Sequence, residues 1–478
     1  MPDFSHLSFG APAAERDIRR GLDAYFIESA AYRNMNTGTK TILVANRGAG
    51  KSAILKTMAR RHRDRGASVI ELAPEDYSYE FLSGAMTREA DGAWAKLGAY
   101  AVAWKYLLLV LIMKELTKRH GRIRRGAESQ IYAYLRDNHR GAAVTPLDSF
   151  VSYLRRIESV KLGSFEAGIR TTELQRLYKL QELEHLIQPL SRLCARSGVT
   201  VLVDELDRGW DASEDAQAFV AGLFQACMSL NDLSPHLHVF MSLRQELYDN
   251  IPALYDDAQK FRDLIEVVRW DEPHLWQLIA CRIRHTVPGL RGVGDDECWA
   301  AVFRDPRWSF RYIVDRSLRR PREIIQYCSH ALEHARQNRS AGGQRIARRD
   351  ILAVEATYSG ERTRDIAAEY RFQHPGLLSV FEAFRGRPAV WTRDDLEFLL
   401  LDIATGAVRT SREATKWIAD RDPDHLLETL WNVGFIRDHS VLSASWAGSD
   451  RADSLTSTRG VSTFAVHPMF RQYVGTLD

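Results

Sequence analysis

A short apolar strand that runs directly into a glycine-rich loop and a helix constrains this chain more than any other feature. The strand, Thr41-Ile42-Leu43-Val44, is a continuous run of apolar and β-branched residues, which is typical of a strand buried on both faces of a parallel sheet. The loop follows at once, and residues 52–62 have the pattern of a helix. Backbone amides in such a loop, with the first turn of the helix, form a concave site for anions. We therefore predict a parallel α/β fold whose first loop binds phosphate.

The loop sequence is specific enough to assign roles to single residues. Residues 45–52 fit the Walker A pattern, with Ala45 in place of the first glycine. Lys51 can reach the β- and γ-phosphates of a nucleotide, and the Ser52 hydroxyl can bind Mg²⁺. A Gly-Lys-Ser tripeptide is common by chance, so the strand before it and the helix after it carry the functional interpretation. We predict that ATP is bound by Asn46, Arg47, Gly48, Ala49, Gly50, Lys51, Ser52 and Ala53.

A second apolar strand ends in two carboxylates. Residues 199–203 are apolar or β-branched, and Asp204 and Glu205 follow directly. In a Walker B strand the first carboxylate holds Mg²⁺ and the second orients the attacking water. A neighbouring acidic pair is commonly just a solvated strand end, but the tight strand and the phosphate loop favour the catalytic interpretation. Asp207 either joins this site or caps the next helix, and the sequence leaves its role open.

The 478 residues predict roughly three domains at about 150 residues each. Residues 1–272 are expected to form the core, with a helical preamble over 9–40 and further strands at 68–72, 238–242 and 265–268. Helical periodicity indicates a large insertion over about 74–196, with helices at 94–116, 131–135, 150–157 and 171–193. Residues 273–370 are predicted to be helical. Residues 371–478 combine helices with a two-stranded hairpin, 434–436 and 462–466, which is typical of a winged helix.

Charge and hydropathy exclude several classes of protein. The formal charge of +3 is too near neutral for a nucleic-acid condenser, although residues 304–349 carry twelve arginines against four acidic residues. The longest apolar run, 106–113, is far too short for a membrane span. The N-terminus lacks the pattern of a secretory signal, so we expect a cytoplasmic protein without membrane contact. Five scattered cysteines argue against zinc and disulfides and favour buried thiols.

The C-terminal part allows a direct test of DNA binding. The last helix of a DNA-binding winged helix brings arginine or lysine to phosphates and bases. The candidate recognition helix, 423–433, contains Asp424 and Glu428 but no lysine or arginine. A packing or partner-binding role is therefore favoured over DNA binding, although the wing and the arginines of 304–349 leave phosphate contacts open.

Four segments together resemble a group of bacterial P-loop ATPases: the preamble 9–32, the loop 46–52, Val203-Asp204-Glu205-Leu206-Asp207-Arg208-Gly209-Trp210, and Arg320-Pro321-Arg322-Glu323. That group is similar to STAND and origin-recognition-type AAA+ ATPases. The resemblance implies an ASCE-type parallel sheet, a helical lid over 273–370 and a C-terminal winged helix. It also implies an ATP-driven regulatory or sensor subunit, often associated with anti-phage defence and acting with an effector protein.

Three arginines are candidates for the positive charge that phosphoryl transfer needs. In related ATPases a γ-phosphate sensor follows the strand that corresponds to 238–242, where Arg244 lies; a salt bridge is the alternative role. Arg322 begins a helix after the sheet, which is the place of a second sensor. Arg262 precedes the strand 265–268, from which a finger reaches a neighbouring subunit, or it is only a solvated arginine.

Two functions follow from these observations. The first is an ATPase switch that assembles as a homo-oligomer and acts on an effector protein in defence. The alternative is an initiator-like ATPase that binds DNA.

Overall fold

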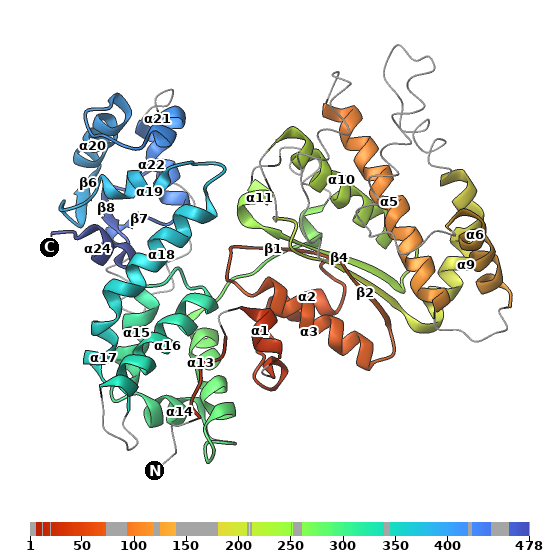
Figure 1. Cartoon of the computed structure of the whole chain (residues 1–478), viewed down its shortest axis with the longest axis horizontal. Helices are drawn as coiled ribbons and strands as arrows, with labels where there is room; N and C mark the ends of the chain where they lie inside the picture. The colour runs from red at the N-terminus through yellow and green to blue at the C-terminus, as the bar shows by residue number, and fades with distance from the viewer. Residues whose placement is uncertain are drawn as a thin grey trace. The chain divides into compact units, whose positions relative to one another are not determined.

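The computed structural model describes residues 6–11, 13–19, 21–72, 93–118, 125–139, 180–207, 210, 213–249, 251, 261–338, 345–418, 423–440 and 458–477. The chain divides into two compact units. Figure 1 shows the whole chain, coloured from red at the N-terminus to blue at the C-terminus. The sheet unit comprises Glu28–Asn46 and Gly50–Arg269. The helical unit comprises Met1–Ile27, Arg47–Ala49 and Trp270–Asp478.

The sheet unit is built on five parallel strands. They are β1 (Ile42–Ala45), β2 (Ser68–Leu72), β3 (Val199–Val203), β4 (Leu237–Arg244) and β5 (Ile265–Val267), in the order β2-β3-β4-β1-β5. Every residue of β1 and β3 is buried, as their continuous apolar sequences require. The expected parallel sheet is therefore confirmed, and its topology is compatible with a P-loop-like fold.

Helices cover both faces of this sheet (Figure 1). On one face lie α2 (Ala30–Asn36) and α3 (Lys51–Asp64), and on the other lie α5 (Ala93–Lys118) and α10 (Glu214–Asn231). The two helices α5 and α10 meet at Gly222, where an added Cβ would lie 2.7 Å from the Ala101 nitrogen and from Tyr100 Cβ. Only glycine permits so close an approach between two helix backbones.

Further helices of the sheet unit are α6 (Ala127–Asn138), α9 (Leu180–Ser197), α11 (Gln245–Asp249) and the 3₁₀ helix η3 (Arg262–Leu264). The helices predicted at 94–116 and 131–135 are present within α5 and α6. The helix predicted at 150–157 and the start of the one predicted at 171–193 lie outside the described residues.

The helical preamble predicted for 9–40 is divided into short helical segments. It contains α1 (Ala14–Ile18), the 3₁₀ turn η1 (Leu22–Ala24) and α2. Gly21 adopts a φ of 92°, which ends helical geometry before η1. The Ser29 side chain accepts a hydrogen bond from the Tyr32 amide and starts α2 as a new helix.

In the part of the predicted helical region that the structure describes, the helical unit has six helices: α13 (Glu272–Thr286), α14 (Asp295–Val302), α15 (Pro306–Asp315), α16 (Pro321–Gln337), α17 (Arg348–Ala353) and α18 (Glu355–Glu369). Their core includes Trp276 and Trp299, whose rings stack with centroids 4.5 Å apart. Phe310 packs edge-on against both rings. This aromatic cluster ties α13, α14 and α15 together.

The C-terminal residues form a second, smaller sheet with helices around it. The strands β6 (Val390–Thr392), β8 (Thr463–Val466) and β7 (Ile436–Asp438) pair antiparallel in that order. The predicted hairpin is present, but β7 begins at Ile436 because Gly434 adopts a φ of 85°. The third strand, β6, was not expected. The helices are α19 (Leu377–Glu382), α20 (Arg393–Thr405), α21 (Arg412–Ile418), α22 (Pro423–Asn432) and α24 (Pro468–Val474).

The described residues can be compared with the expectations about membrane spans and about cysteines. No helix among them has both the length and the apolar character that crossing a membrane requires. All five cysteines are free thiols, and four of them are buried: Cys194, Cys227, Cys298 and Cys328.

Candidate nucleotide-binding site

The predicted phosphate loop connects β1 to α3. Gly48 and Gly50 both adopt left-handed backbone angles, with φ of 83° and 102°. These angles would strain any other residue, so the two glycines let the chain turn sharply from the strand into the helix. Lys51 is the first residue of α3 and Ser52 the second. The loop therefore ends at the positive pole of a helix of 14 residues, where backbone amides favour an anion.

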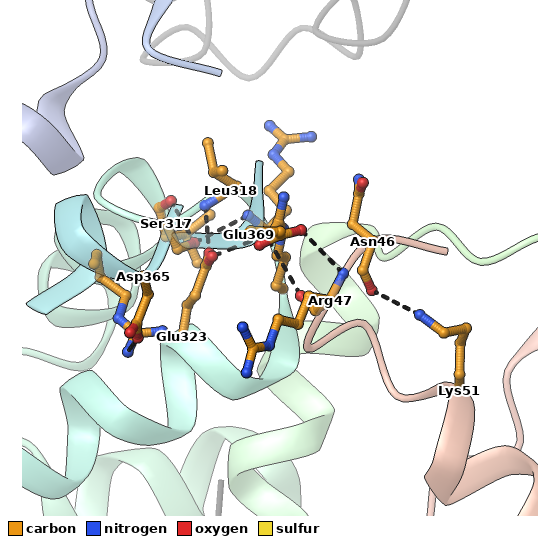
Figure 2. A network of polar contacts seen from close by, with 12 residues as sticks. Asn46, Arg47, Lys51, Ser317, Leu318, Glu323, Asp365 and Glu369 are labelled. Atoms are coloured by element: carbon orange, nitrogen blue, oxygen red, sulfur yellow. Dashed lines mark hydrogen bonds and ion pairs between the residues drawn. The ribbon is translucent and has the colours of Figure 1, made fainter. Parts of the chain in front are cut away.

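The side chain of Lys51 turns back toward the start of the loop. Its Nζ donates to the carbonyl oxygens of Ala45 at 2.8 Å and Asn46 at 3.5 Å, the second of which is drawn in Figure 2. Burial lowers the pKa of Lys51, while the negative charges of Glu246 and Asp204 raise it. The ammonium group thus contacts the loop backbone and is stabilised by carboxylates that follow β3 and β4. A phosphate would offer it a stronger, charged acceptor than these carbonyls.

The acidic end of β3 is held by its neighbours in the sheet. The Asp204 amide donates to the Leu72 carbonyl at 2.9 Å, and the Ser242 hydroxyl of β4 donates to the Asp204 carboxylate. Asp204 is buried, which fixes its direction. Glu205 adopts a φ of 61°, a left-handed angle that is uncommon for a residue other than glycine. Such backbone strain concentrates at functional sites.

Arg244, at the end of β4, is engaged by two carboxylates. It forms ion pairs with Asp207 and, at 3.6 Å, with Glu246. The salt bridge that the sequence offered as its alternative role is therefore present. Of the two roles left open for Asp207, the structure excludes the helix cap, since Ser213 caps α10 by accepting a hydrogen bond from the Ala216 amide at 3.2 Å.

The middle of the loop belongs to the helical unit, where Arg322 contacts it. The Arg322 amide donates to the Gly48 carbonyl at 3.3 Å. A Cβ added to Gly48 would lie 3.0 Å from Arg322 Cβ. The proposed second sensor thus lies directly against the loop. Arg262, the candidate finger, is exposed at the start of η3, just before β5.

Mg²⁺ would be held here by few protein ligands. The described residues contain no cluster of three or more histidine, cysteine, aspartate or glutamate side chains suited to a metal. Mg²⁺ beside phosphates commonly uses one or two protein oxygens and takes its other ligands from phosphate and water. The buried carboxylate of Asp204 and the hydroxyl of Ser52 are oxygen donors of the required kind.

Sequence reasoning missed several residues around the loop. Ser242 and Glu246 lie two residues before and two residues after Arg244. Their positions next to the end of β4 could have indicated that they belong to the same site. Trp270 donates from its indole Nε1 to the Ala49 carbonyl at 2.8 Å. Glu369, the last residue of α18, accepts a hydrogen bond from the Arg47 amide at 3.4 Å. Neither Trp270 nor Glu369 carries a local pattern that would reveal these contacts.

Comparison with known proteins gives two matches. A family model described as "FunZ-associated C-terminal helical domain" matches residues 273–367, which are α13 to α18. The chain is also 24% identical over 479 residues to the "Putative transposon gamma-delta 80.3 kDa protein" of Escherichia coli (strain K12). That match covers 97% of this chain and 66% of the relative, so the chain spans less than two thirds of that protein. No solved structure matches.

Proposed function

We propose that this protein binds and hydrolyses ATP as a P-loop ATPase of the ASCE and AAA+-like type. The observation that carries the proposal is the position of Lys51, half-buried at the end of the β1 loop, where the charge of Asp204 raises its pKa. A cation on the phosphate loop and a carboxylate on β3 are the two charges that MgATP requires. The strand β4 lies between β1 and β3 and brings Ser242 against Asp204.

Each side chain has a separate task in the proposed reaction. Lys51 and the amides of the loop bind the phosphates. Ser52 and Asp204 would hold Mg²⁺, which would supply further positive charge at the phosphates when bound. Glu205 accepts a proton from the attacking water as the general base. Arg322, from the helical unit, supplies positive charge as a sensor. Arg244 can do the same only if nucleotide draws it from Asp207 and Glu246.

We further propose that nucleotide state controls assembly with other proteins, so that the ATPase is a switch. Arg262 is exposed beside β5, at one edge of the sheet, which suits a finger offered to a second copy of the chain. The C-terminal order is α19, β6, α20, α21, α22, β7, β8, α24, and its helices followed by the antiparallel pair β7 and β8 support a winged helix. A role in anti-phage defence with an effector rests on the family resemblance alone.

DNA binding is the second candidate function, because the name of the E. coli relative describes it as a putative transposon protein. The charge distribution favours it less. Among the described residues of 304–349, seven arginines form ion pairs with carboxylates, as Arg307–Asp296, Arg311–Asp315, Arg316–Glu355, Arg319–Glu272, Arg320–Glu369, Arg348–Asp305 and Arg349–Asp350. These pairs reduce the net charge available to DNA phosphates. Steeply salt-dependent binding of duplex DNA by the full chain would favour this candidate.

The test of the proposed function compares two variants of the full chain. Lys51→Ala removes the phosphate-binding charge and is expected to abolish ATP binding. Glu205→Gln removes the base while preserving its shape, so it is expected to retain binding and slow hydrolysis by roughly 10²-fold or more. Titration with a fluorescent ATP analogue and a phosphate-release assay measure the two effects. Equal loss of nucleotide affinity in both variants would refute the assignment of Glu205.

A further inference from the structure

Three consecutive carbonyl groups of the phosphate loop accept hydrogen bonds from the helical unit. The Arg47 carbonyl accepts from Arg320 Nη1 at 3.2 Å, and the Gly48 carbonyl accepts from the Arg322 amide at 3.3 Å. The Ala49 carbonyl accepts from the Trp270 indole at 2.8 Å. Each donor comes from a different residue, and all lie outside the motif that is expected to bind ATP.

These three bonds fix the direction of the loop amides. A trans peptide is planar, so the carbonyl of one residue and the N–H of the next point in opposite directions. The described residues contain no cis peptide. Since the carbonyls of Arg47, Gly48 and Ala49 point toward the donors of the helical unit, the N–H groups of Gly48, Ala49 and Gly50 point away from them. Amides turned to one side in this way form the concave anion site of a phosphate loop.

A buried ion pair holds both of the peptide groups that flank the Cα of Arg47. Arg320 Nη1 donates to the Glu369 carboxylate at 2.9 Å and 3.3 Å, and Glu369 in turn accepts from the Arg47 amide at 3.4 Å (Figure 2). The side chains of Arg320 and Glu369 are 7% and 3% exposed. Arg47 thus has its N–H against the carboxylate and its carbonyl against the guanidinium.

Glu323 secures the turn that carries Arg320. Its carboxylate accepts from the Leu318 amide at 2.6 Å and lies 3.8 Å from Arg320 Nε. The planar fork of the guanidinium is held between two buried carboxylates, which leaves it one orientation. The ion pair of Arg320 with Glu369 is therefore rigid enough to hold the loop.

We propose that Arg320, Glu369 and Trp270 are positioning residues that preorganise the phosphate loop without touching the nucleotide. This inference rests on the proposed function, since it concerns the same ATP site. Binding a ligand to a loop already in its bound shape avoids the cost of ordering that loop. Nucleotide affinity thus depends on side chains that act only through loop carbonyls and amides.

A purely structural role for these residues is the competing explanation, and the chain offers controls that separate the two. Trp299 also donates from a buried indole to a backbone carbonyl, that of Trp276 at 3.0 Å, far from the loop in sequence. Arg316 and Glu355 form a second ion pair in the helical unit, at 2.6 Å, between α15 and α18. Among the described residues, the hydrogen bond of Trp299 and the ion pair of Arg316 with Glu355 both lie outside the phosphate loop.

The test measures nucleotide affinity and folding stability of the full chain for Trp270→Phe and Trp299→Phe. Each substitution removes one indole hydrogen bond and retains an aromatic ring. We expect Trp270→Phe to weaken binding of a fluorescent ATP analogue about fivefold to tenfold, the effect of one hydrogen bond, and to raise KM more than it lowers kcat. Trp299→Phe is expected to lower stability and leave affinity unchanged. Wild-type affinity in Trp270→Phe would overturn the inference.

A second comparison tests the ion pair. Glu369→Gln is expected to weaken nucleotide binding more than Glu355→Gln, by tenfold or more, because it leaves Arg320 buried with one carboxylate fewer. Equal affinity in the two folded variants would count against the role of Glu369. Failure of the proposed function looks different: wild type and Lys51→Ala would then bind the analogue equally poorly.

Discussion

Replacing Gly48 with alanine tests the loop conformation itself. The φ of 83° at this residue costs an L-amino acid about 1–2 kcal/mol. The new Cβ would also lie 3.0 Å from Arg322 Cβ, and overpacking of this kind costs about 1–3 kcal/mol. The loop can escape both costs by changing shape, but a nucleotide that needs the original shape must then restore it. We expect ATP affinity to fall by at least about tenfold, which corresponds to about 1.4 kcal/mol.

Gly66→Ala is the matched control. Gly66 has nearly the same φ, 87°, but an added Cβ there would have nothing within 4 Å. This variant carries the backbone strain without the contact and lies beyond the far end of α3. It should lose about 1 kcal/mol of stability in chemical denaturation and keep wild-type affinity for a fluorescent ATP analogue. If Gly48→Ala also binds with wild-type affinity, nucleotide does not require the loop conformation described above.

Two further predictions concern assembly and pH. If Arg262 is a finger, Arg262→Ala loses ATPase activity as a purified variant and regains part of it when mixed with Lys51→Ala, whereas full activity of Arg262→Ala alone would place the finger elsewhere. Burial, with nearby Arg437 and Arg471, holds the pKa of His467 well below its usual range, so the folded protein keeps this side chain neutral. The unfolded chain takes up a proton below pH of about 6.5, and stability present above that pH is lost as the pH falls. His467 accepts a hydrogen bond from the Met469 amide at the start of α24, and His467→Asn retains such an acceptor. Between pH 7.5 and 5.5, wild type should lose about 1 kcal/mol more stability in chemical denaturation than this variant; parallel losses would contradict the assignment.

The parallel sheet was predictable because the sequences of β1 and β3 are local signals of fully buried strands. Residues 42–45 are apolar and residues 199–203 are apolar or β-branched, which is the pattern of a strand covered on both faces. The strand β6 was not predictable in this way, since it has three residues and only Trp391 is buried. Its pairing with β8 is made by residues more than 70 positions away in the chain.

The same distinction applies to the candidate site. The roles suggested for Lys51, Ser52 and Asp204 follow from their positions next to a strand or helix. The contacts of Glu369 do not follow from its position in the sequence. Its partners are Arg320, which lies 49 residues away along the chain, and the Arg47 amide, which lies 322 residues away. Long-range pairs of this kind depend on how helices pack, and a single sequence holds no periodic signal for them. The division of the preamble into short helices has a local cause, since Gly21 and Ser29 interrupt a spacing that otherwise fits one helix.

The close approach of α5 and α10 at Gly222 has a consequence for how this protein can diverge. One methyl group at that position would force two helix backbones apart, so substitution there changes the attachment of the whole α5 segment. Tyr132 on α6, in contrast, is 40% exposed, and no close approach of two backbones depends on it. Among relatives that retain the segment, we expect position 222 to stay glycine while the outer surface of α6 varies freely. Natural variation would then be concentrated where another molecule could touch it, and the junction with the sheet would be preserved.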